Sequence, residues 1–205
     1  MTATAAATGS RRRTTRPRDE FDPTPWPIAL LCGVGGGVCA LLAFPPYDLW
    51  MLLPVAIALL GAGLLVRSAW LAGLVSLLWG LALFVPLTEW ANTYAGTTPW
   101  IALGVFEALY VVVFGLLART VMVRRGLCVT SAVVVSALWV ALEALRGSVP
   151  WGGLPWGASA FALAKSPLLH LAPWIGIAGL AFVVALLGQL LLFGALSLLG
   201  RRRRG

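Results

Sequence analysis

The feature that most constrains this chain is a series of six apolar stretches, each close to the length needed to cross a membrane. A helix needs about 20 residues to span roughly 30 Å of hydrocarbon. Only 11% of the 205 residues are charged, against about 25% in a soluble domain, so a soluble surface cannot be built. The sequence therefore predicts an all-α, polytopic membrane helix bundle with about six spans. We place them at residues 28–44, 50–66, 70–87, 99–118, 127–145 and 171–199.

The basic residues predict how the bundle is oriented. Thirteen of the fifteen Lys and Arg precede the first span, follow the last, or lie in two of the turns; only Arg146 and Lys165 fall on the other side. By the positive-inside rule, both termini are cytoplasmic. We expect residues 1–26 to form a disordered basic cytoplasmic tail, residues 27–200 a six-span membrane domain whose first span is retained, and residues 201–205 a basic cytoplasmic end. Nucleic-acid binding is a poor alternative, because these basic runs flank spans and lack interleaved aromatic residues.

The stretch at residues 143–157, EALRGSVPWGGLPWG, carries the most unusual pattern. Glu143 and Arg146 share one helix face at the outer end of the fifth span. Glycines and prolines then stop the helix, so we expect an outer interfacial arm at about 147–170. One interpretation is an aromatic belt in which Arg146 snorkels to the interface, or pairs only with Glu143 and closes the helix end. The other is a lipid-facing site, with Arg146 binding a phosphate or carboxylate. The candidate lipid- or substrate-binding residues are Trp139, Glu143, Arg146, Trp151, Pro155, Trp156, Glu89 and Trp90.

Two polar side chains are predicted to lie inside the membrane. Glu107 falls in the outer half of the fourth span, where a carboxylate is costly and faces a bundle interior or a wet cavity. Arg146, His170 and Tyr110 are its possible partners, and the sequence does not choose among them. Gln189, deep in the last span, is expected to form a hydrogen bond between helices. A single His excludes a histidine-rich metal site, and the three Cys are expected to be packing residues, so we predict no metal and no cofactor.

Four stretches, in order, resemble one family. ALWVALEALRGSVPWGGLPWG is similar to the Trp-x-x-x-Glu-x-x-Arg-Gly…Pro-Trp signature of apolipoprotein N-acyltransferases. LLAFPPYDLWML resembles the first hairpin of that family, and GLALFVPLTEWANTYAGTTPW its third span and outer loop. PLLHLAPWIGIAGLAFVVALLGQLLL resembles the start of its next helix. The resemblance extends over residues 28–199.

This resemblance implies a bacterial inner-membrane enzyme. The family moves a fatty acyl chain from a phospholipid to the α-amino group of a lipoprotein's diacylglyceryl-cysteine. It does so through a thioester on a Cys of a nitrilase-like domain outside the membrane, with Glu and Lys as partners. No stretch of this chain resembles that domain. We therefore expect the membrane portion alone, without catalytic residues. Its expected partners are membrane phospholipid, bacterial lipoproteins and a separate or missing nitrilase-like domain.

Two alternatives remain open from the sequence. The chain could be a non-enzymatic membrane scaffold that keeps the fold and docks another protein. It could also be a small transporter, since acidic residues cluster at the outer side. Against the transporter, spans 1–3 and 4–6 show no internal repeat.

The orientation is directly testable. A reporter enzyme that is active only outside the cytoplasm should be silent when fused at Gly205, because the arginines hold that end inside. Strong reporter activity at this position would contradict the predicted topology.

Overall fold

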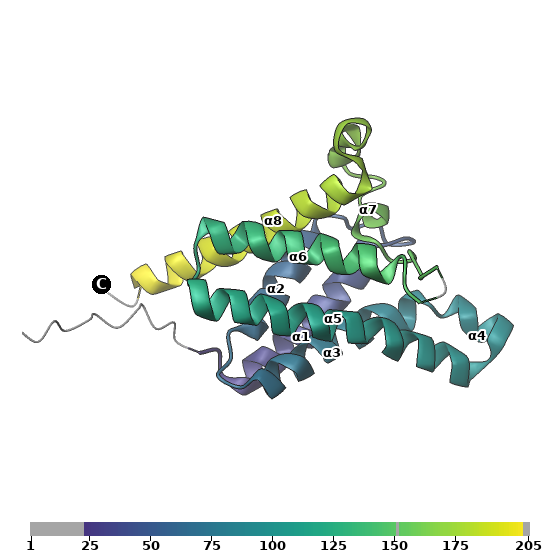
Figure 1. The fold of residues 1–205 in the computed structure, drawn as a ribbon, viewed down its shortest axis with the longest axis horizontal. Helices are drawn as coiled ribbons and strands as arrows, with labels where there is room; N and C mark the ends of the chain where they lie inside the picture. Colours follow the sequence, from purple (N-terminus) through teal and green to yellow (C-terminus); the bar gives the residue numbers. More distant parts are fainter. Residues whose placement is uncertain (1–22, 151, 203–205) are drawn as a thin grey trace, which may run out of the picture.

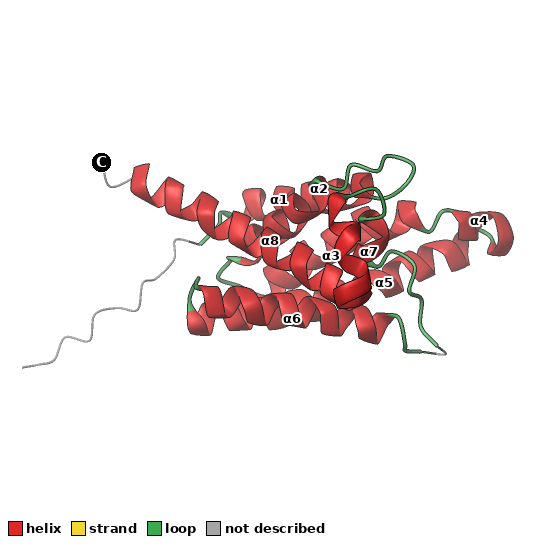
Figure 2. Cartoon of the chain, turned by 90° about the horizontal axis from the view of Figure 1, so that it is seen from above, coloured by secondary structure: helices red, strands yellow, loops and turns green. Residues whose placement is uncertain are grey.

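The computed structural model describes residues 23–150 and 152–202, and within them every regular element is a helix. The long axes of most helices run in one common direction (Figures 1 and 2). Residues 1–22 of the predicted basic tail, Trp151 and the last three residues lie outside the described residues, and Trp26, the last residue of that predicted tail, begins the first helix. The elements are α1 (Trp26–Ala43), α2 (Leu52–Leu64), α3 (Ala69–Leu87), α4 (Trp90–Ala95), α5 (Thr97–Arg125), α6 (Val129–Arg146), α7 (Ser159–Ala162), the 3-10 helix η1 (Pro167–Leu171) and α8 (Ala172–Arg202).

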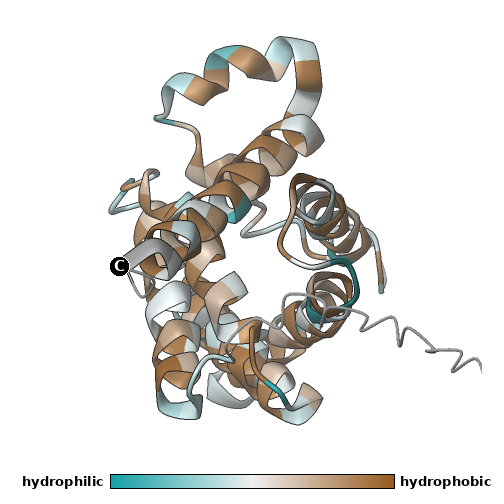
Figure 3. Cartoon of the chain, turned by 90° about the vertical axis from the view of Figure 1, so that its left-hand side faces the viewer, coloured by the Kyte–Doolittle hydropathy of each residue, from teal (hydrophilic) through white to brown (hydrophobic). Residues whose placement is uncertain are grey.

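The all-α fold predicted from the apolar stretches is confirmed, and five helices are long and apolar enough to cross a membrane. These are α1, α3, α5, α6 and the η1–α8 segment, Pro167–Gly200. The predicted second span corresponds to α2, whose 13 residues fall short of a full crossing. Apolar residues dominate the helices (Figure 3), as expected where lipid takes the place of water. The chain is a multi-pass membrane protein.

Helix boundaries differ from the prediction mainly at the ends of spans. The predicted fourth span, 99–118, lies within α5, which is 29 residues long and ends at Arg125. Sequence reasoning did not find α4, a six-residue helix between the third and fourth spans. The predicted arm is not a plain loop, because α7 and η1 lie within it. Gly176, at φ 65°, then bends the start of α8.

Small residues let α1, α3 and α5 approach closely. A Cβ added at Gly33 would lie 2.8 Å from the carbonyl oxygen of Val75 in α3, and one at Gly37 would clash with the carbonyl oxygen of Trp79. Gly80 of α3 meets α5 in the same way, because its Cβ would lie 2.7 Å from the Cα of Ala108. Helices in lipid associate through such close packing, because the burial of apolar surface contributes little to their association there. Gly33 and Gly37 are four residues apart, so both lie on the face of α1 that packs against α3.

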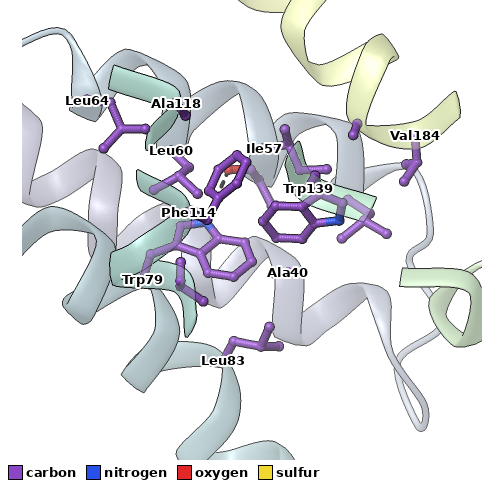
Figure 4. Close-up of a cluster of buried hydrophobic side chains, with 14 of the residues drawn as sticks. Ala40, Ile57, Leu60, Leu64, Trp79, Leu83, Phe114, Ala118, Trp139 and Val184 are labelled. Carbon is purple, nitrogen blue, oxygen red and sulfur yellow. Dashed lines mark hydrogen bonds between the residues drawn. The ribbon is translucent and has the colours of Figure 1, made fainter. Parts of the chain in front are cut away.

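An aromatic cluster fills the centre of the bundle (Figure 4). The ring of Trp139 in α6 packs edge-on against Trp79 of α3 and Phe114 of α5, with centroids 5.7 Å and 5.0 Å apart. The Trp79 indole N–H donates to the carbonyl of Ala56 in α2 at 3.2 Å. Four helices therefore meet around one buried core.

Substituting Gly37 should test the close packing of α1 on α3. We expect Gly37→Ala to lower the free energy of unfolding by about 1–3 kcal/mol, because the new methyl group overpacks against backbone. Gly35→Ala is the matched control: a Cβ there meets nothing within 4 Å. Unfolding in detergent micelles, followed by circular dichroism, measures the difference. Equal stability of the two variants would show that this helix pair is not tightly packed.

Candidate functional site

The candidate site is built around Arg146, the last residue of α6. Only 4% of this residue is exposed. Its Nη1 donates to Glu107 Oε2 at 3.0 Å, to the carbonyl of Leu154 at 3.0 Å and to the carbonyl of Trp156 at 2.6 Å. The guanidinium carbon lies 5.0 Å from the centroid of the Phe84 ring. The charge is thus compensated inside the protein, by an anion, two carbonyl dipoles and an aromatic face.

Glu107 is the ionic partner, and it comes from the neighbouring helix α5. It is only 2% exposed, so the pair is buried on both sides. Of the three partners that the sequence left open, Arg146 is therefore the one that pairs with Glu107. Tyr110 instead donates its hydroxyl to the carbonyl of Val149 at 2.6 Å. The interpretation in which Arg146 pairs only with Glu143 is wrong.

Glu143, one turn earlier on α6, anchors the arm. Its Oε1 accepts hydrogen bonds from the backbone N–H of Ser159 at 2.8 Å and from the Ser159 hydroxyl at 2.7 Å. The hydroxyl oxygen in turn accepts from the indole N–H of Trp139 at 3.0 Å. Because Ser159 opens α7, this network fixes the short helix against α6. Sequence reasoning missed Ser159, which belongs to no recognisable motif.

The segment between Arg146 and Ser159 folds back over the end of α3. Gly147 caps α6, and the backbone N–H of Leu154 donates a hydrogen bond to the carbonyl of Arg146 at 3.0 Å. Gly157, at φ 79°, sits where a Cβ would lie 2.8 Å from Leu87 and 3.1 Å from the ring of Phe84. Such a left-handed conformation in so little space requires glycine. The loop therefore brings its carbonyl groups to Arg146 and its tryptophan to the rim.

The predicted lipid-binding residues separate into a buried set and an exposed rim. Trp139 and Arg146 are buried, and Trp139 belongs to the central core. Trp156 is half exposed; its indole N–H donates to the carbonyl of Leu87 at 3.3 Å, and its ring packs edge-on against Trp90. Glu89 and Pro155 are also exposed at this end. The structure thus brings Glu89, Trp90, Pro155 and Trp156 to the surface above the buried pair, and Trp151 lies outside the described residues.

Gln189 is buried in α8, as predicted, but its expected interhelical hydrogen bond is absent. Its Oε1 has no hydrogen-bond partner within the described part of the chain. The side chain faces Gly61 of α2, whose added Cβ would lie 3.8 Å from Nε2. Glycine offers no side-chain group to bond, which explains why the predicted pairing failed.

The described residues suit binding and positioning rather than covalent chemistry. Hydrogen bonds from Ser131, chiefly from its backbone N–H, hold the pKa of the Cys128 thiol below its usual value. However, this Cys precedes α6, and the 18 residues of that helix place it about 27 Å from Arg146. No group of three or more His, Cys, Asp and Glu that could hold a metal occurs among the described residues.

Comparison with known proteins identifies the family of this chain. Residues 36–190 match the model of the apolipoprotein N-acyltransferase N-terminal domain. The chain belongs to this family. The matched range contains Glu107, Glu143, Arg146 and Ser159, the four residues of the buried network.

The relatives that this chain matches are apolipoprotein N-acyltransferases. The apolipoprotein N-acyltransferase of Photobacterium profundum is 34% identical over 176 residues, covering 77% of this chain and 32% of that protein. That of Mycolicibacterium smegmatis is 38% identical over 161 residues, covering 78% of this chain and 26% of that protein. The chain therefore spans about a third, or less, of the length of these apolipoprotein N-acyltransferases.

The buried ion pair predicts a large stability effect. Glu107→Gln removes the only carboxylate within ion-pair distance of Arg146 among the described residues. We expect it to cost about 3–5 kcal/mol of unfolding free energy, because a buried guanidinium is left without a counter-charge. The double variant Glu107→Met/Arg146→Met should recover much of this loss, since neither charge remains.

The matched control is Glu89→Gln, which neutralises an exposed acid at the same end of the bundle. It should change the unfolding free energy by less than about 0.5 kcal/mol. Denaturant titration in micelles measures all three variants. If Glu107→Gln is as stable as Glu89→Gln, the buried pair is not what holds this end together.

Proposed function

We propose that this chain serves as the membrane portion of an apolipoprotein N-acyltransferase in the bacterial inner membrane. In this role it brings a phospholipid acyl donor and a lipoprotein acceptor to a nitrilase-like catalytic domain on the outer side. The observation that carries the proposal is the family match over residues 36–190, which encloses the whole buried network at the Arg146 end. The catalytic step itself is proposed to belong to the nitrilase-like domain.

The proposal includes an orientation. Arg67 lies in the connection between α2 and α3, and Arg119, Arg124 and Arg125 lie in the last turns of α5. Arg119 donates to the carbonyls of Val66 and Arg67, so these residues share one end of the bundle. The described part of α8 stops at this end, and α4 lies at the opposite end (Figure 1). The positive-inside rule supports placing the arginine-rich end in the cytoplasm. The Arg146 end is then the outer end, and all six apolar helices would contribute to the membrane domain, with α2 too short to cross fully.

The rim is proposed to contact substrate, and the buried pair to position the rim. Trp90 and Trp156 expose indole rings at the proposed outer interface, the depth that indole favours. Arg146 binds two carbonyls of the loop that carries Trp156, so it fixes that side chain without being exposed itself. A lipid platform made of the rim, supported by Arg146 and Glu143 from beneath, replaces the one in which Arg146 holds the phosphate directly.

A chimera tests this function. The corresponding membrane segment of the Mycolicibacterium smegmatis relative would be replaced by residues 36–190 of this chain, and acylation of a diacylglyceryl lipopeptide measured in vesicles. We expect acyl transfer. Within the chimera, Trp156→Ala should raise the apparent KM for phospholipid severalfold, because it removes rim contact area.

Trp70→Ala is the matched control, since Trp70 is exposed at the proposed cytoplasmic start of α3. It should leave acyl transfer unchanged. A chimera that inserts and folds but transfers no acyl chain would overturn the proposed function and favour a scaffold.

A further inference from the structure

A groove of about 240 Å³ separates α6 from α8 near Glu143. The two helices diverge toward the Arg146 end of α6, and α7 lies in the angle between them (Figure 1). Six of the eleven residues that line the groove are Ala or Gly, so short side chains leave the volume open. Three segments contribute to the walls: the last turns of α6, the arm around residues 155–160, and the start of α8 after Gly176.

The groove is continuous with the apolar surface of the bundle. It runs from Val140 to Ser148, and Val140 lies about 9 Å below the end of α6 at 1.5 Å per residue. Ile177, on the opposite wall, is 68% exposed. An acyl chain can therefore enter sideways from surrounding lipid. A void of this size would otherwise forfeit the packing contacts of its walls.

Charge defines the other end of the ligand. The buried network holds two carboxylates, Glu107 and Glu143, but one guanidinium, Arg146, which pairs with Glu107. The second ion pair among the described residues joins Lys165 to Asp48, so it supplies no cation to Glu143. Both hydrogen bonds that the described residues give to Glu143 go to Oε1. The carboxyl group that lines the groove therefore has no ion-pair partner among the described residues, and its Oε2 accepts no hydrogen bond from them.

We propose that this groove binds a resident phospholipid with a primary ammonium headgroup. One acyl chain fills the space between α6 and α8, and the ammonium donates a hydrogen bond to Glu143. The lipid is a structural component that stays in place rather than an acyl donor. It seals the outer divergence of the two helices and packs under the arm that Ser159 and Lys165 hold down. The inference rests on the proposed function only for placing this end of the bundle in the outer leaflet.

Native mass spectrometry of the purified chain tests the proposal. The protein would be reconstituted into vesicles of equal parts phosphatidylethanolamine, phosphatidylcholine and phosphatidylglycerol with identical chains, then extracted in mild detergent. We expect one retained phosphatidylethanolamine per chain. Phosphatidylcholine should not replace it, because its quaternary ammonium has no N–H to donate.

Two variants separate the headgroup contact from the chain contact. Glu143→Gln keeps an acceptor for Ser159 but removes the charge, and it should weaken phosphatidylethanolamine retention about tenfold, the usual effect of losing a charge-assisted hydrogen bond. Ala178→Phe fills the groove and should abolish retention of all three lipids. Leu187→Phe, on the exposed face of α8, is the control and should retain lipid normally.

Each result decides between outcomes. Equal retention of the three lipids, or unchanged retention in Glu143→Gln, overturns the headgroup assignment; unchanged retention in Ala178→Phe overturns the groove. Thermal unfolding confirms that each variant is folded, and if Ala178→Phe fails to fold it is replaced by Ala181→Leu, at another groove position. If the active chimera converts the retained lipid to its lyso form, the lipid is a substrate and the resident role is overturned. An inactive chimera that still retains phosphatidylethanolamine would overturn the proposed function alone.

Discussion

The end of the bundle that holds Arg146 depends on the compensation of this one buried guanidinium. A charge inside hydrocarbon is costly unless it is paired and its remaining hydrogen-bond donors are used. Arg146 is paired with a carboxylate from α5, and its Nη1 also donates to two carbonyls of its own loop. The loop must therefore turn back within a few residues, which explains the left-handed glycines at 152, 153 and 157. Removing the charge would remove the reason for that turn.

Close apolar packing and polar contacts stabilise different parts of the bundle. Toward its middle, glycines bring α1, α3 and α5 into backbone contact, and three aromatic rings tie α6 to them. This part needs few polar groups, since each backbone bond is satisfied within its own helix. Around Arg146, helices diverge and polar bonds replace close packing. Arg146 joins α6 to α5, Glu143 joins α6 to α7, and Lys165 joins the arm to the turn between α1 and α2. The rigid part thus supports a part that can carry a surface loop and a groove.

The positions of the helices could be predicted from local sequence, but the side-chain contacts between helices could not. Apolar runs predicted the helices to within a few residues at most ends, and the Glu–Arg–Gly stretch predicted where α6 stops. What the sequence left undecided concerns residues far apart in the chain. Glu107 lies 39 residues before Arg146, and only the packing of α5 against α6 selects Arg146 over His170 or Tyr110 as its partner. Trp139 was among the candidate lipid- or substrate-binding residues, and its contacts with Trp79 and Phe114, which come from other helices, place it in the core. Gln189 shows the same limit, because its position was predictable and its glycine neighbour was not.

The burial of Arg146 changes how this end of the molecule can act on a substrate. Only 4% of Arg146 is exposed and its Nη1 already makes three hydrogen bonds inside the protein, so the guanidinium is poorly placed to bind a phosphate at the surface. Its influence must pass through the loop, where it holds the carbonyl of Trp156, the residue that does reach the surface. Changes at Arg146 and at Trp156 would then alter one property by different routes. The first loosens the position of the rim, and the second removes its contact area. A charge that looks like a ligand-binding residue in sequence is thus buried in the fold, where it holds the loop that carries Trp156, while the aromatic rings of Trp90 and Trp156 are exposed.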